Sequence, residues 1–136
     1  MSTRSYICKL SADGNAEVIY CHHDGYPAHV GRLLHFFYNH PESVNTLISM
    51  GYISSLGQTL EESKFFFRDK MADWSEVCPM NMPSDEFSEF IKEELLGHAH
   101  TIEYIYVYKE ADYKWYCLTA GKYGDSIEET ELGELV

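Results

Sequence analysis

The chain has 136 residues, which is the length of one domain with a single substantial core. Its 22 acidic and 10 basic side chains give a formal net charge of −12, and this charge argues against direct binding of DNA or RNA, which depends on cationic side chains. No apolar run approaches the ~18 residues that a membrane-spanning helix needs, so we expect a soluble protein of the cytoplasm.

Two alternating segments, residues 5–10 and 16–22, flank an Asp13-Gly14 pair, which favours a tight hairpin turn. With these two residues at the centre of the turn, three facing pairs follow: Cys8–Ile19, Tyr6–Cys21 and Arg4–His23. One face of the hairpin then carries Tyr6, Cys8, Leu10, Ile19 and Cys21, and the other carries Ile7, Val18 and Tyr20. Because side chains alternate along a strand, a slip of one residue would reverse both faces.

Two helices are predicted after this hairpin. Pro27 suits the first position of a helix whose apolar stripe is Val30, Leu33, Leu34 and Phe37. Gly31 within it indicates a close crossing over the sheet. The second helix begins at Pro41, buries Val44, Leu47 and Ile48, and ends at Gly51.

The middle of the chain is harder to interpret. Residues 64–68 fit a buried strand or a helical turn, and we favour the strand. Residues 71–83 are predicted to form a loop, with Trp74 folded back onto the body. Ser84 is expected to cap a helix that ends at Gly97 and buries one stripe, namely Phe87, Phe90, Ile91 and Leu95.

Residues 101–108 and 113–119 predict a second hairpin, rich in tyrosine and β-branched residues. The expected fold is therefore α+β, with a mainly antiparallel sheet from two hairpins, with or without one further strand, packed with about three helices. Residues 1–124 would form a single domain, and residues 125–136 an acidic, flexible tail. Exposed strand edges and abundant tyrosine also make a homo-oligomer plausible.

The phrase Ile19-Tyr20-Cys21-His22-His23-Asp24-Gly25-Tyr26-Pro27 concentrates titratable and aromatic groups where a strand becomes a helix. Together with Thr3-Arg4-Ser5-Tyr6-Ile7 it resembles a family of small phage and prophage proteins. Shorter matches support the likeness: Val30-Gly31, residues 53–57, residues 67–69, residues 103–106 and residues 114–116. The resemblance implies a phage setting inside a bacterial host cell and a role against host defences, and it brings no activity with it.

Catalytic readings of this phrase are weak. Neighbouring strand residues point to opposite faces, so His22 and His23 do not easily share a metal ion, even with His98 and His100 nearby in the fold. The four cysteines, Cys8, Cys21, Cys78 and Cys117, form no C-x-x-C pair. We therefore expect reduced thiols, no metal and no cofactor. Cys21 would point with the apolar face, which disfavours a thiolate nucleophile. A small hydrolase that uses His22 and Asp24, with or without a metal, stays an alternative.

Binding without chemistry fits the residue types better. An anion is well served by arginine and histidine donors, and a planar ring by tyrosine faces. The candidate ligand-binding residues are Arg4, His22, Asp24 and Tyr26, followed by Tyr20, His23 and Arg68. The opposing structural interpretation is that Asp24 caps the Pro27 helix and that His22 is a satisfied structural histidine.

The favoured function is thus a non-enzymatic counter-defence protein that sequesters a small anionic, nucleotide-like ligand. The alternative is an acidic inhibitor that imitates a polyanion toward a basic host defence protein, such as a nuclease or a CRISPR effector. Added salt should weaken such a protein complex far more than it weakens a ligand held in a pocket.

Overall fold

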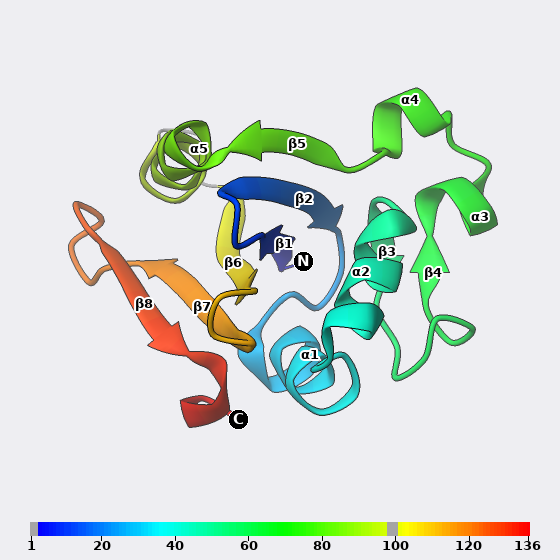
Figure 1. Ribbon diagram of the computed structural model, residues 1–136, viewed down its shortest axis with the longest axis horizontal. Coiled ribbons are helices and arrows are strands. Elements are labelled where there is room, and N and C mark those ends of the chain that lie inside the picture. The colour runs from blue at the N-terminus through cyan, green and yellow to red at the C-terminus, as the bar shows by residue number, and fades with distance from the viewer. Residues whose placement is uncertain (1–2, 98–100) are drawn as a thin grey trace.

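One mixed sheet runs through the computed structural model, which describes residues 3–97 and 101–136 (Figure 1). Within these residues the sheet has eight strands in the order β4-β3-β2-β1-β6-β7-β8, and β5 pairs with β2 outside this path. The strands are β1 (Arg4–Leu10), β2 (Asn15–Cys21), β3 (Ile53–Ser55), β4 (Lys64–Phe65), β5 (Met80–Pro83), β6 (Ile102–Lys109), β7 (Lys114–Ala120) and β8 (Ile127–Glu131). The fold is α+β and mostly antiparallel, as predicted, but the sheet is larger than two hairpins, and β1 runs parallel to β6.

Helices cover both faces of this sheet, so its central strands are buried on two sides. They are the π-helix η1 (Pro27–Gly31), α1 (Arg32–Phe37), α2 (Pro41–Ser49), α3 (Phe66–Lys70), α4 (Trp74–Val77), α5 (Ser84–Leu96) and the 3-10 turn η2 (Leu132–Glu134). One core lies between the sheet and η1, α1 and α2; the other lies between the sheet and α5. No helix of the described residues is long and apolar enough to cross a membrane.

The predicted register of the first hairpin is wrong by one residue. The loop has three residues, since Ser11 N donates to Asn15 O (2.8 Å) and Gly14, at φ +91°, occupies the left-handed position that closes it. Tyr6 therefore faces Tyr20, and Cys8 faces Val18. Both predicted faces change accordingly: Ile7, Ile19 and Cys21 lie in the α1–α2 core, whereas Cys8 and Val18 lie in the α5 core. Continued by one pair, the register sets Arg4 opposite His22 rather than His23.

The predicted helices and the second hairpin are present, with local differences. Helix α1 ends at Phe37, and Tyr38 leaves the helical path at φ −132° and turns into the core, so Phe37 stays exposed. Pro83, not Ser84, occupies the N-cap position of α5. Gly31 does mark a close crossing: a Cβ there would lie 3.2 Å from Leu132 and 3.5 Å from Tyr106.

Residues 64–83 contain more structure than their sequence predicts. Residues 64–68 divide between β4 and α3, and the predicted loop over 71–83 holds α4 and β5. Strand β5 pairs with β2 from Asn15–Pro83 to Val18–Met80, and its Met82 side chain is buried in the α5 core. Because its hydrogen-bonding partner is remote in sequence, this short strand has no local signature. Trp74 does fold back, and its ring packs against Phe67 at 5.1 Å between centroids.

The predicted flexible tail is also wrong, because residues 125–136 belong to the fold. Strand β8 pairs with β7 from Tyr116–Glu131 to Ala120–Ile127, and Leu132 in η2 is fully buried in the α1–α2 core. Two of the acidic side chains in this stretch are paired: Glu129 with Lys109 (3.0 Å) and Glu131 with Lys114 (3.4 Å). The acidic composition of this segment is typical of a flexible tail. Its ion pairs and the buried Leu132 side chain nevertheless attach it to the fold.

Candidate functional site

The turn after β2 is held by backbone hydrogen bonds from neighbouring segments. The N–H groups of His22 and His23 donate to Ile53 O (2.9 Å) and Ser54 O (3.0 Å), so the strand continues along β3. Gly25 N donates to Thr3 O (2.9 Å), and the buried hydroxyl of Tyr106 donates to Gly25 O (2.6 Å). The side chains that this turn carries are therefore positioned by a rigid frame.

Four side chains gather at this end of the sheet, and we call them the β2-end cluster: Arg4, Tyr20, His22 and His23. The Tyr20 hydroxyl and Nδ1 of His22 share a hydrogen bond of 2.7 Å. The two imidazole rings meet edge to face, with centroids 4.5 Å apart. All four side chains are half-buried, so each retains contact with solvent.

Arg4 supplies a positive charge to this cluster. Burial, the neighbouring His23 and the Arg4 guanidinium together lower the pKa of His22, so its neutral form is favoured at neutral pH. Burial raises the pKa of Tyr20, and Arg4 opposes that rise. Among the described residues Arg4 forms no ion pair with a carboxylate, whereas five other cations do: Lys9, Arg68, Lys92, Lys109 and Lys114.

Aromatic rings that are not among the predicted site residues surround the cluster. The ring of Tyr20 lies 5.8 Å from that of Tyr52 and 5.9 Å from that of Tyr6, and the ring of His22 lies 6.4 Å from that of Phe66. The sequence would have predicted Tyr6 beside Tyr20 if the hairpin register had been predicted correctly, because the observed register sets these two residues opposite each other. Tyr52 and Phe66 come from separate segments, and no local pattern connects them to β2.

Two predicted site residues lie in the turn but outside this cluster. Asp24, at φ 55°, is exposed, and within the described chain its side chain neither caps η1 nor forms a hydrogen bond; only its carbonyl accepts from Val30 N (3.3 Å). Tyr26 is exposed and lies against His29, with ring centroids 6.2 Å apart. Neither residue joins Arg4 and His22.

Arg68 has a structural role that its sequence position does not reveal. Its terminal nitrogens donate to Leu60 O (2.9 Å) and Ser63 O (2.6 Å), while its Nε donates to the Asp69 carboxylate. The guanidinium also lies 5.0 Å from the Phe65 ring centroid. Since its donors are used to hold the loop before β4, Arg68 is removed from the candidate site.

Cys21, next to the cluster in sequence, is enclosed within the core. It is fully buried, and burial raises the pKa of its thiol to about 12, so the thiol is protonated at neutral pH. Cys8, Cys21 and Cys117 lie in strands and are buried, as predicted, and all four cysteines are free thiols. No group of three metal-ligating side chains occurs within residues 3–97 and 101–136; the predicted imidazoles of His98 and His100 lie outside the described residues.

Comparison with known proteins does not assign this site. No protein-family model, curated protein or solved structure matches the chain significantly. The resemblance to small phage proteins therefore stays a prediction, and only the geometry bears on function.

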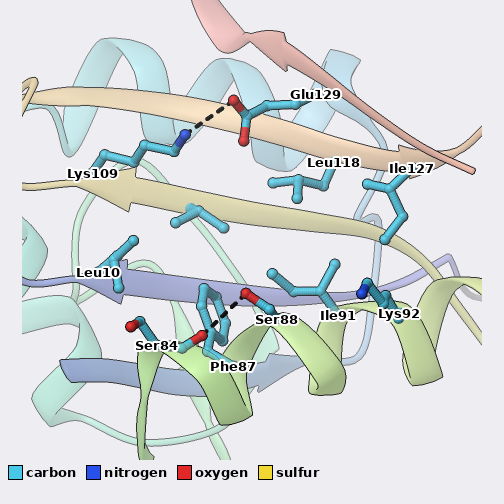
Figure 2. A pocket seen from close by; sticks show the side chains of 11 residues that line it. Leu10, Ser84, Phe87, Ser88, Ile91, Lys92, Lys109, Leu118, Ile127 and Glu129 are labelled. Carbon is cyan, nitrogen blue, oxygen red and sulfur yellow. Dashed lines mark hydrogen bonds and ion pairs between the residues drawn. The ribbon is translucent and has the colours of Figure 1, made fainter. Parts of the chain in front are cut away.

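An apolar hollow on the α5 side offers less chemistry than the cluster. It has a volume of about 310 Å³ and lies between α5 and the strands β6, β7 and β8, with Phe87, Ile91 and Leu118 among its walls (Figure 2). Its two lysines are both paired, Lys109 with Glu129 (3.0 Å) and Lys92 with Glu89 (3.5 Å). The hollow thus provides apolar contact without an unpaired charge to select a ligand.

Proposed function

We propose that this chain is a non-enzymatic binding protein that holds a small anionic, nucleotide-like ligand at the β2-end cluster. The observation that supports the proposal is Arg4, an arginine without a carboxylate partner among the described residues, beside two imidazoles on a chain of net charge −12. A strongly acidic protein repels anions generally, so a local positive site would be selective for the ligand that fits it.

The side chains of the cluster suit both parts of such a ligand, its anionic group and its planar base. The planar guanidinium of Arg4 can donate two parallel hydrogen bonds to a phosphate or carboxylate. The rings of His22, Tyr20 and Phe66 present edges and faces on which a base can stack, and a stacked base contributes ~1–3 kcal/mol. Binding then requires no covalent step, and the buried Cys21 thiol takes no part in it.

Replacement of Arg4 by alanine is expected to weaken ligand binding at least ~10-fold, because a charge-assisted hydrogen bond to the anion is lost. The measurement is equilibrium dialysis of the purified protein against a panel of ribonucleoside mono- and triphosphates. Lys70→Ala is the matched control, since Lys70 is exposed and forms no ion pair within the described chain. The melting temperature should change little in either variant. A large loss of stability in Arg4→Ala, or equal binding by both variants, contradicts the proposal.

Affinity should also rise as the pH falls from 8 to 5.5. The lowered pKa of His22 leaves its imidazole neutral at neutral pH, and protonation at lower pH adds a positive charge beside the bound anion. A cyclic nucleoside monophosphate is the suitable probe, because its phosphodiester does not titrate in this range. His22→Gln should flatten the dependence, while His40→Gln, at a separate exposed position, should preserve it. A profile that is flat in the wild-type protein would exclude a role for the imidazole charge.

The resemblance to small phage proteins extends this proposal to a biological role. A phage protein that binds a nucleotide-like signal tightly would remove that signal from a host defence system. The alternative, polyanion mimicry, draws on the net charge of −12 rather than on this site, and two side chains of the acidic C-terminal stretch, Glu129 and Glu131, are already paired with lysines. A salt titration separates the two, since a complex steered by surface charge dissociates at high ionic strength.

A further inference from the structure

A second hollow, unrelated to the β2-end cluster, lies beside the first helical segment. Its volume is about 540 Å³, within the range of small-molecule sites. It opens between η1–α1 and the segment that follows β3, and its lining residues are Ala28, His29, Arg32, Leu33, Phe36, Phe37 and Gln58. None of these residues belongs to the cluster of Arg4.

The two walls of this hollow are joined by side-chain hydrogen bonds. Nε2 of His29 donates to Leu56 O (3.3 Å), and the hydroxyl of Tyr38 donates to Gly57 O (2.9 Å). Gly57 N in turn donates to Ser63 Oγ (2.8 Å), which ties the second wall to the loop before β4. A hollow whose walls are held in this way loses little conformational freedom when a ligand enters.

The lining combines one charge with two exposed rings. Arg32 lies 5.4 Å from the ring centroid of Phe36 and, like Arg4, forms no ion pair within the described residues. Phe36 is 52% exposed and Phe37 is 47% exposed, although phenylalanine is ordinarily a core residue. Neither ring belongs to the buried cores of the fold, so about half of each ring is available for contact with a ligand.

We propose that this hollow binds a planar aromatic anion, a small molecule in which a ring system carries a phosphate or carboxylate. The ring would stack against Phe36 or Phe37, the anionic group would receive hydrogen bonds from the Arg32 guanidinium, and the Gln58 amide would supply a further donor. The site shares no residue with the β2-end cluster, so Arg32→Gln and Arg4→Ala distinguish binding at the two positions.

The test is a titration of the ¹⁵N-labelled protein with 1-naphthyl phosphate at pH 7.5, followed by NMR. The expected result is a saturable shift of amides in residues 28–37 and 58, with inorganic phosphate and 1-naphthol binding at least ~10-fold more weakly because each offers half of the chemistry. Arg32→Gln should weaken naphthyl phosphate binding ~10-fold or more. Phe36→Ala should weaken it as well, whereas Phe67→Ala, which removes a ring that is 50% exposed elsewhere, should not.

Several outcomes would overturn the proposal. One is equal affinity in Arg32→Gln and the wild-type protein; another is a shift pattern confined to residues near Arg4 and abolished by Arg4→Ala. A third is that Phe36→Ala changes the oligomeric state, measured by sedimentation, while ligand affinity is unaffected, since the exposed rings would then serve a protein contact. Circular dichroism of each variant confirms folding, which is expected because both phenylalanines are half exposed.

Discussion

Replacement of Leu132 by alanine is expected to lower the free energy of unfolding by about 3 kcal/mol, as measured by chemical denaturation. Leu132 is fully buried in the core formed with η1, α1 and α2, and its Cδ1 lies 3.2 Å from the position that a Cβ on Gly31 would take. The truncation leaves a cavity that the crossing of η1 over the sheet prevents from collapsing. Helix η1 and the C-terminal segment would therefore lose stability together.

Leu135→Ala provides the matched control for this effect. Leu135 is the same residue type three positions along, but it is 46% exposed, so its truncation should cost less than ~0.5 kcal/mol. If the two variants unfolded at the same denaturant concentration, residues 125–136 would contribute nothing to the fold, and the flexible tail suggested by their acidic composition would be the correct description.

Tyr106→Phe is expected to cost about 2 kcal/mol of stability, because it leaves a buried carbonyl without its donor. The Tyr106 hydroxyl is fully buried and donates to Gly25 O at 2.6 Å, inside the turn that carries His22 and His23. Burial also raises the pKa of this hydroxyl, so it stays protonated and remains a donor at neutral pH. Ligand affinity at the β2-end cluster should fall as well, since the turn loses one of its supports.

Tyr108→Phe is the control that separates the loss of the Tyr106–Gly25 hydrogen bond from the loss of a buried hydroxyl group as such. Tyr108 is equally buried, two positions along the same strand, but its hydroxyl has no hydrogen-bond partner among the described residues. Its removal should leave stability within ~0.5 kcal/mol of wild type or increase it. Thermal denaturation of both variants decides the matter: equal losses would mean that the Tyr106–Gly25 contact does not hold the turn.

Local patterns were sufficient for the three predicted helices and for one hairpin, but they did not predict α3 or α4. The stripe Val44, Leu47 and Ile48, followed by Gly51 at φ +80°, predicted α2 correctly, because periodicity and capping act within a few residues. The alternation over 101–119 likewise predicted β6 and β7 within a residue. For the candidate site, residue types alone suggested an arginine, a tyrosine and two histidines near one turn.

Pairing between strands that lie far apart in sequence determined the features that local sequence patterns did not predict. One additional loop residue between β1 and β2 reversed both faces of the hairpin and set Arg4 against His22, because side-chain direction alternates with every residue. Strands β5 and β8 exist only because β2 and β7 offer them hydrogen-bonding edges. The donors of Arg68 are used by carbonyls five and eight residues away, whereas Arg4 acts electrostatically on Tyr20 and His22, which the pairing of β1 with β2 brings close to it. Composition and spacing therefore determine which charged and aromatic side chains the chain carries. The tertiary structure determines which of them come into contact, because that depends on strand pairing between segments that lie far apart in sequence.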